Sequence, residues 1–192
     1  MKILIIYAHP NTIGHCSTLL KEVRDNLDSK NIEYELIDLY KIKYDPILHE
    51  NEHYTAGNFN ITKQNQGIQE KIRQTNKFIF IYPVWWNTMP AVLKGFFDRI
   101  LTPHFAYYFK GRMPIKLLKG KKALVFITLS SPNILSYFFM GDRAKKIIKK
   151  EILGFCGIKS RVYKIGNATN LTEKQIKKIK IKVKKGLNYL YS

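Results

Sequence analysis

Stretches with the length of a β-strand alternate along the chain with stretches in which apolar residues recur every three or four positions. The strand-like stretches, at residues 2–8, 32–39, 78–82, 123–129 and 161–165, are apolar or alternate apolar with polar residues. Helical spacing follows Ser17, covers residues 68–75, follows Pro90, covers residues 144–153 and follows Thr172. Strands that alternate with helices predict an α/β protein whose parallel sheet is covered by helices on both faces.

Residues 78–101 form the most informative stretch, FIFIYPVWWNTMPAVLKGFFDRIL. An apolar run ends at Pro83, and a loop with two tryptophans follows. Pro90 suits the first position of the next helix, because the N–H that proline lacks is unpaired there. In an open α/β sheet, ligands bind at the carboxyl ends of the strands, so Trp85 and Trp86 would suit a flat aromatic ring. The alternative is that both tryptophans belong to the core.

The turn after the first strand is a candidate anion site. Ser17 is expected to be the N-cap of the next helix. A helix N-terminus presents unpaired N–H groups and the positive end of the helix dipole, so it can hold a phosphate. The polar residues that would surround the phosphate are His9, His15, Cys16, Ser17 and Thr18. The alternative is an ordinary turn, with Cys16 a small buried residue rather than a nucleophile.

Length and composition favour one domain over residues 1–192. Neither a secretory signal nor an apolar run long enough to span a membrane is recognisable. We therefore expect a cytoplasmic protein without membrane association. Cys16 and Cys156 are too few and too far apart to indicate a disulfide framework or a metal site.

The chain is strongly basic, with 33 Lys and Arg against 14 Asp and Glu and a formal net charge of +19. Such a charge is typical of proteins that bind nucleic acids or anionic surfaces. The lysines are densest near the C-terminus, where apolar residues keep a helical spacing. These apolar residues are Ile176, Ile179, Val183, Leu187 and Leu190. We therefore expect the solvated face of a helix and no nucleic-acid partner.

The phrase YPVWWNTMPAVLKGFFDRIL, residues 82–101, resembles the central motif of the flavodoxin-like NAD(P)H:quinone oxidoreductases. The positions in register with that motif are Pro83, Trp86, Pro90, Ala91, Leu93, Lys94, Gly95, Asp98 and Arg99. YAHP at residues 7–10 is similar to the first loop of the family, and DLY at residues 38–40 with DPIL at residues 45–48 to its second. The resemblance implies a flavodoxin-like doubly wound five-stranded parallel sheet, of strand order 2-1-3-4-5, with helices on both faces.

The resemblance also implies a set of flavin-binding residues. At the flavin phosphate it places His9, His15, Cys16 and Ser17. Along the isoalloxazine ring it places Pro83, Val84, Trp85, Trp86 and Asn87, largely through their backbone groups. At the polar edge of the flavin it places Thr128, Leu129, Ser130 and Ser131, where the two serines replace glycines common in the family.

Further aromatic residues are expected near the substrate. Tyr107 corresponds to the F-A-Y segment of the family, which lines the substrate pocket, often from the partner subunit. It is the predicted catalytic residue. Tyr137, Phe138 and Phe139 form a second aromatic cluster that could cap the site.

A member of this family would accept hydride from NADH or NADPH on a bound flavin and pass two electrons to a quinone or a similar small aromatic acceptor. FMN is the expected cofactor, with FAD as the alternative, and a homodimer is expected. Two other functions stay open: a flavin-binding regulatory subunit of a potassium-efflux system, and a one-electron carrier of the flavodoxin type. The sequence leaves the physiological acceptor and the nicotinamide preference undecided.

Overall fold

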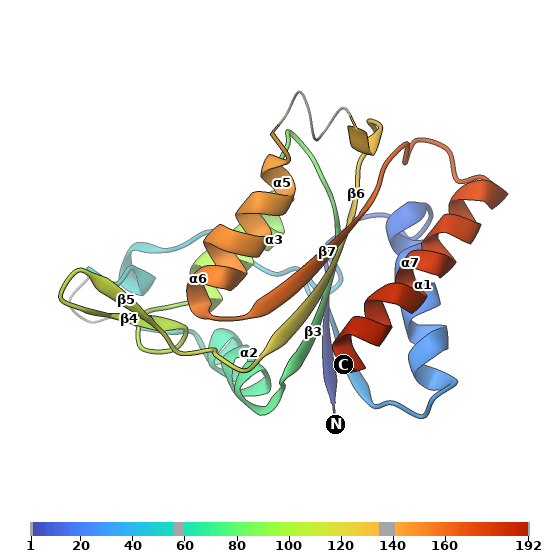
Figure 1. Cartoon of the computed structure of the whole chain (residues 1–192). Helices are drawn as coiled ribbons and strands as arrows, with labels where there is room; N and C mark the ends of the chain where they lie inside the picture. The colour runs from blue at the N-terminus through green and yellow to red at the C-terminus, as the bar shows by residue number, and fades with distance from the viewer. Residues whose placement is uncertain (1, 56–59, 135–140, 192) are drawn as a thin grey trace.

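A five-stranded parallel sheet forms the centre of the molecule, with helices on both of its faces (Figure 1). The computed structural model describes residues 2–55, 60–134 and 141–191. The strands are β1 (Ile3–Tyr7), β2 (Tyr34–Asp38), β3 (Lys77–Pro83), β6 (Lys122–Thr128) and β7 (Lys159–Ile165), in the spatial order β2-β1-β3-β6-β7. Because β6 and β7 are the fourth and fifth predicted strands, the predicted α/β fold and strand order are confirmed.

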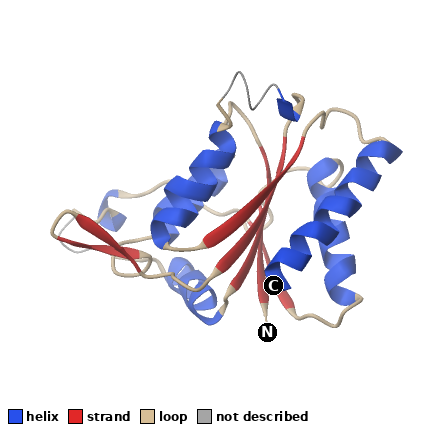
Figure 2. Cartoon of the chain, in the orientation of Figure 1, coloured by secondary structure: helices blue, strands red, loops and turns tan. Residues whose placement is uncertain are grey.

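The helices divide between the two faces of the sheet (Figure 2). One face carries α1 (His15–Asp28) and α7 (Glu173–Tyr191), which contact each other. The other face carries α2 (Lys63–Gln74), α3 (Ala91–Ile100), α5 (Arg143–Lys146), the π-helix η2 (Ile147–Leu153) and α6 (Gly154–Cys156). Among the described residues, no helix has both the length and the apolar character that a membrane span needs.

Each central strand is buried on both sides. In β1, Ile3, Ile5 and Tyr7 pack with α1 and α7, whereas Leu4 and Ile6 pack with the helices of the opposite face. Successive side chains of a strand point to opposite faces, so a strand that is covered on both must be apolar throughout. This is why the continuous apolar runs became central strands, whereas the alternating run became the edge strand β2.

The start of α1 differs from the prediction. Gly14, not Ser17, is the N-cap, and the helix begins at His15. Gly14 has a φ of 118°, which glycine adopts readily and other residues rarely do. The Ser17 hydroxyl donates a hydrogen bond of 2.9 Å to the Gly14 carbonyl oxygen from inside the first turn. The predicted N-cap role of Ser17 is therefore wrong. At α3, Pro90 is likewise the N-cap, one position before the expected one.

The polar segment between β2 and α2 packs against α3 and includes the short 3-10 helix η1 (Glu50–Glu52). Arg99 is buried and donates hydrogen bonds to the Asp45 carbonyl oxygen and, over 2.9 Å, to the Glu52 carboxylate. Gly95 lies so close to this segment that a Cβ there would be 2.0 Å from the Pro46 carbonyl oxygen. The segment is therefore tightly packed rather than an idle loop, as its length indicates.

The sequence pattern does not predict the antiparallel hairpin of β4 (Tyr107–Lys110) and β5 (Met113–Lys116). The hairpin projects from the side of the molecule that carries α2, α3 and α6 (Figure 1). Its turn contains Gly111, whose φ is 61°. The hairpin places Tyr107 well away from the carboxyl ends of the central strands, where the loops after β3 and β6 lie.

Candidate functional site

The strands β3, β6 and β7 end in register with one another, and their carboxyl ends border a polar cavity of about 240 Å³. Thr128, at the end of β6, pairs with Pro83 of β3 and with Ile165 of β7, so the loops after these strands meet. The predicted residues that line the cavity are His9, His15, Cys16, Pro83, Val84, Trp85, Thr128, Leu129 and Ser130. The predicted residues outside its lining are Ser17, Trp86, Asn87, Ser131 and Tyr107.

The first wall of the cavity is the N-terminus of α1. No side chain caps this helix, and no acidic residue lies in its first turn. His15 is only 6% exposed, and its Nε2 has no hydrogen-bond partner among the described residues. Burial lowers the pKa of His15, so its imidazole is neutral near pH 7. This end of the helix therefore offers both a positive dipole end and an unpaired ring nitrogen to an anion.

Cys16 joins this helix to the end of β6. Its Sγ lies 3.4 Å from the Thr128 hydroxyl oxygen. Burial raises the pKa of the Cys16 thiol to about 12, although the contact with Thr128 lowers it in part. The residue is therefore a protonated thiol at neutral pH, as expected for a small buried residue and not for a nucleophile.

His9 connects the first loop with the tryptophan loop. Its Nδ1 accepts a hydrogen bond of 3.1 Å from the Asn11 backbone N–H, which fixes the ring. The centre of that ring lies 6.2 Å from the ring centre of Trp85. Both residues line the cavity, so a ligand there would contact the two loops together.

Residues 85–88 form a tight turn at the rim of the cavity. Trp85 and Thr88 exchange two backbone hydrogen bonds of 2.9 and 3.0 Å, and the residues between them, Trp86 and Asn87, have φ values of 50° and 60°. Two successive positive φ values are typical of a type I′ turn. Trp86 is 100% exposed and Trp85 41% exposed, so the alternative of two core tryptophans is wrong.

Another wall of the polar cavity contains residues that the sequence analysis missed. Ala168 and Thr169, from the loop between β7 and α7, line the cavity with Leu129 and Ser130. The Ala168 N–H donates a hydrogen bond of 2.8 Å to the Leu129 carbonyl oxygen, which holds the two loops together. The only sequence signal for this wall is the pair Gly166-Asn167, a turn directly after the last strand.

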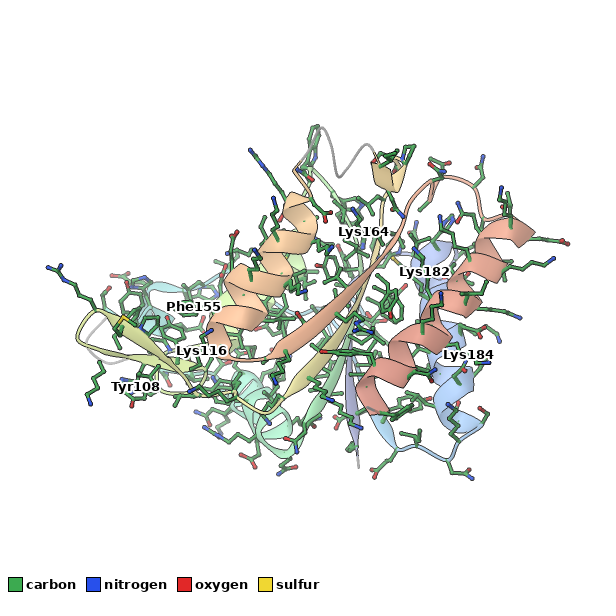
Figure 3. The ribbon with its side chains drawn as sticks, in the orientation of Figure 1. Tyr108, Lys116, Phe155, Lys164, Lys182 and Lys184 are labelled. Carbon is green, nitrogen blue, oxygen red and sulfur yellow. The ribbon has the colours of Figure 1, made fainter. Side chains whose placement is uncertain are left out.

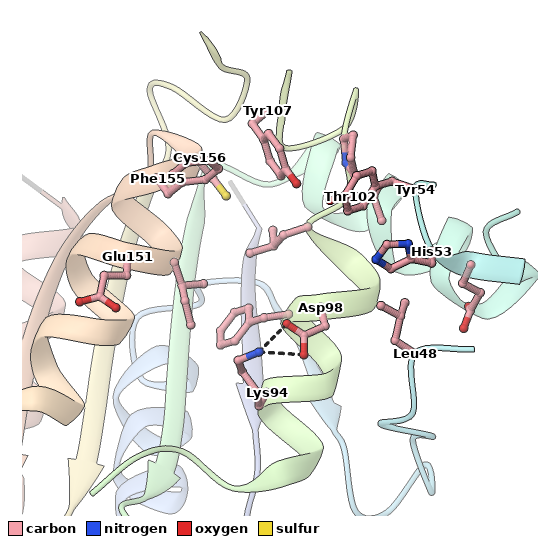
Figure 4. Close-up of a pocket in the computed structure, with 15 residues that line it drawn as sticks. Leu48, His53, Tyr54, Lys94, Asp98, Thr102, Tyr107, Glu151, Phe155 and Cys156 are labelled. Atoms are coloured by element: carbon pink, nitrogen blue, oxygen red, sulfur yellow. Dashed lines mark hydrogen bonds and ion pairs between the residues drawn. The ribbon is translucent and has the colours of Figure 1, made fainter. Parts of the chain in front are cut away.

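Tyr107 lies elsewhere, in a largely apolar cavity of about 340 Å³ between α3, α6 and the segment around η1. Figure 4 shows Tyr107 with Phe155 and Cys156 on one side of this cavity and His53 on the other. The rings of Tyr107 and Phe155 meet edge to face, with their centres 4.9 Å apart. Tyr107 and the loops of the polar cavity therefore line separate cavities of one chain. The predicted cluster of Tyr137, Phe138 and Phe139 lies outside the described residues.

The lining of the polar cavity fits a flavin. None of the described residues that line it is acidic, so a phosphate would meet no negative side chain. His15 Nε2 and, in the neighbouring tryptophan loop, Asn87 Oδ1 are buried without a partner among the described residues. Such atoms usually find one, so they are available to a bound ligand. The exposed indole of Trp86 adds an aromatic surface at the rim.

Solved structures share this fold. Smu.1420 from Streptococcus mutans is 33% identical in sequence, with a TM-score of 0.85 over 96% of this chain and 97% of that chain. An FMN-dependent NADH-azoreductase from Bacillus anthracis, in complex with FMN, has a TM-score of 0.79 over 100% of both chains. At 18% identity, the azoreductase shows the fold alone.

Two relatives carry oxidoreductase names. An uncharacterized NAD(P)H oxidoreductase of Haemophilus influenzae is 29% identical over 95% of this chain and 92% of its own length. The ribosyldihydronicotinamide dehydrogenase (quinone) of Pongo abelii is 28% identical over 66% of this chain, and the match spans 62% of that relative. The family model described as flavodoxin-like fold matches residues 1–187. The chain therefore belongs to the flavodoxin-like fold family.

Proposed function

We propose that this protein is a flavin-dependent NAD(P)H oxidoreductase that passes two electrons to a quinone or a similar acceptor. The observation that carries the proposal is the cavity at the carboxyl edge of the sheet, where the loops after β1, β3 and β6 meet. The names of the two relatives agree with it. A bound flavin would supply the redox chemistry, accepting hydride from the nicotinamide and passing two electrons to the acceptor.

FMN is the flavin that suits the cavity best. Its single phosphate would lie at the N-terminus of α1, near His9 and His15. FAD would need further contacts for a second phosphate and an adenosine. The azoreductase of the same fold is solved with FMN, which also favours this choice.

The chain would hold the flavin ring between two joined loops. The Val84 N–H donates a hydrogen bond of 2.8 Å to the Thr128 carbonyl oxygen, so the loops after β3 and β6 form one support. Backbone groups of residues 84–87 and 128–131 would provide donors and acceptors for the edges of the ring. The exposed Trp86 would exclude water from one side of the nicotinamide or acceptor.

A second copy of the chain would complete the acceptor site. Tyr107 lines a different cavity from the flavin loops of its own chain, so its proposed role requires the partner subunit. Phe109, Met113 and Leu117, on or beside the hairpin, are 58%, 69% and 41% exposed, which is typical of an interface.

Sedimentation equilibrium is expected to give the mass of a dimer, and Met113→Asp is expected to weaken the dimer. A monomer that reduces quinones at full rate would contradict the shared site.

The visible spectrum of the purified protein, followed by anaerobic addition of NADH or NADPH, tests the function. Flavin bands that bleach promptly and return when a quinone is added would support the oxidoreductase and identify the donor. Flavin that stays oxidised would support the regulatory or carrier function instead. Failure to retain any flavin, even after reconstitution, would contradict the site. Chromatography of the released cofactor distinguishes FMN from FAD.

A matched pair of histidine variants tests the phosphate site. His9→Asn is expected to weaken FMN binding about tenfold, because a hydrogen bond to a charged group contributes roughly 1.5–3 kcal/mol and asparagine restores it in part. His104→Asn changes an exposed histidine outside the cavity and is expected to leave FMN binding unchanged. The dissociation constant is measured by quenching of flavin fluorescence. Equal dissociation constants of FMN for both variants would mean that its phosphate does not bind beside His9.

A further inference from the structure

The outer surface of α7 carries a ring of lysines around one exposed isoleucine. Ile181 is 56% exposed, whereas Ile179, Val183, Leu187 and Leu190 of the same helix are buried against the sheet. On an α-helix, residues three and four positions apart are neighbours. The neighbours of Ile181 at those spacings are Lys177, Lys178, Lys184 and Lys185. We call these four lysines and Ile181 the lysine face; Lys184, one of its members, is labelled in Figure 3.

The lysine face has no counter-charge of its own. Glu173, in the first turn, is the only acidic residue of α7. Among residues 2–55, 60–134 and 141–191, no acidic side chain pairs with a lysine of this face. Like charges at helical spacing repel one another, so the helix is held by its buried side. An unpaired row of cations attracts an anionic surface from solution.

Positive charge continues beyond the end of the helix. The Lys77 ammonium lies 5.0 Å from the ring centre of Tyr191, and that of Lys30 lies 5.4 Å from it. Both lysines come from other elements, so the basic surface is broader than one helix. Its extent suits a flat anionic partner better than a single small ion.

We propose that the lysine face binds the anionic headgroups of a lipid bilayer, with Ile181 as its apolar contact. Clustered lysines attract anionic lipids, and an apolar side chain among them can enter the headgroup region. A protein surface that binds nucleic acid would be expected to offer arginines or aromatic side chains for stacking on bases, and the lysine face has neither. Peripheral binding of this kind differs from the expectation of no membrane association and needs no membrane span. It is independent of the flavin chemistry.

Sedimentation with vesicles tests this proposal. The flavin-loaded protein is expected to bind vesicles of phosphatidylcholine mixed with phosphatidylglycerol, to ignore pure phosphatidylcholine and to be released by salt. The double variant Lys177→Gln, Lys185→Gln is expected to bind about 30-fold more weakly, since each lysine near the surface contributes about fivefold. Ile181→Ser is expected to weaken binding without changing the salt dependence.

The control variant is Lys149→Gln with Lys150→Gln. It removes the same charge from exposed positions on η2, which lies on the opposite face of the sheet. Equal weakening by both double variants would overturn the proposal, because total charge alone would then explain binding. Absence of binding to anionic vesicles at low salt, or preference for duplex DNA over vesicles at equal salt, would also overturn it. Bleaching of the flavin by NAD(P)H without vesicles is measured for every variant, so a failure of the proposed function is recognised separately.

Discussion

At the scale of single residues, Trp86 combines full exposure with a left-handed backbone, at φ 50°. For a residue with a Cβ, this conformation costs roughly 1–2 kcal/mol. Because the indole is fully exposed, no burial of apolar surface offsets that cost. Strain of this kind persists where the neighbouring structure imposes it and is frequent at functional sites. The turn between Trp85 and Thr88 imposes this backbone, and we propose that the indole of Trp86 serves a contact made during function.

Trp86→Gly is expected to separate stability from function. Glycine tolerates the positive φ and no buried surface is lost, so the free energy of unfolding should stay unchanged or rise by up to about 1 kcal/mol. Turnover of NAD(P)H with a quinone should fall about tenfold, the equivalent of one lost aromatic contact. Urea unfolding and steady-state kinetics measure the two effects. Lower stability with full activity would contradict this account.

His15 makes stability depend on pH. Burial holds its pKa below the ordinary value of 6.5, so the unfolded chain takes up this proton at a higher pH than the folded one. The neutral, buried His15 contributes its full share to the free energy of unfolding above pH 6.5. That share is lost as the pH falls from 6.5 through the pKa of His15 in the folded protein. The slope from this one group is at most about 1.4 kcal/mol per pH unit.

Urea unfolding of wild type and His15→Phe over a series of pH values tests this effect. The loss of stability below pH 6.5 is expected to be shallower in His15→Phe, because the buried ring no longer titrates. His104→Asn, which changes an exposed histidine, should keep the slope of the wild type. Identical slopes for all three proteins would show that other groups cause the acid sensitivity.

At the scale of elements, two helical glycines are expected to respond to alanine in opposite directions. At Gly95 in α3, a Cβ would lie 2.0 Å from the Pro46 carbonyl oxygen, so Gly95→Ala must push two packed segments apart. Overpacking of this kind costs about 1–3 kcal/mol. At Gly67 in α2, a Cβ would meet nothing within 4 Å, and Gly67→Ala should gain about 0.5–1 kcal/mol from helix propensity.

The midpoints of urea unfolding for both variants check this prediction. A gain in stability for Gly95→Ala would mean that α3 and the segment around Pro46 can move apart freely. The buried pairing of Arg99 with Glu52 argues against such freedom, because it ties the same two segments together.

The sequence predicts elements well where burial determines the pattern. The apolar runs at residues 78–82 and 123–129 became β3 and β6 with boundaries shifted by one residue at most. The hairpin of β4 and β5 was missed because its strands have four residues each and are half-exposed, so no alternation marks them. The helix expected at residues 144–153 exists. The spacing of its apolar residues does not reveal that Ile147–Leu153 form a π-helix.

At the scale of the whole molecule, the candidate site is predictable only in part. Motifs near His9, Trp85 and Thr128 could be recognised because each follows a buried strand. Ala168 enters the cavity through a backbone hydrogen bond to Leu129, which exists only because β7 lies beside β6. No local pattern reveals that neighbourhood. The proposed role of Tyr107 beside a flavin would likewise depend on a second chain, which periodicity within one chain cannot describe.

The net charge of +19 predicts that salt stabilises the protein. Repulsion among unpaired lysines opposes the compact state, and added salt screens it, since the Debye length falls from about 30 Å at 0.01 M to about 8 Å at 0.15 M. The thermal midpoint is therefore expected to rise as NaCl is added over this range. A falling midpoint would mean that the attractive ion pairs outweigh the repulsion.

The cavity that spans residues 9 to 169 has a consequence for how the protein is made. A chain still under synthesis carries the loops after β1 and β3 long before the loop after β7 can close beside them. Flavin that binds this cavity would therefore bind the finished fold alone and add its binding free energy to that state. The supply of cofactor during growth would then set how much of the new protein escapes degradation, and the yellow colour of a preparation would report the fraction that has folded.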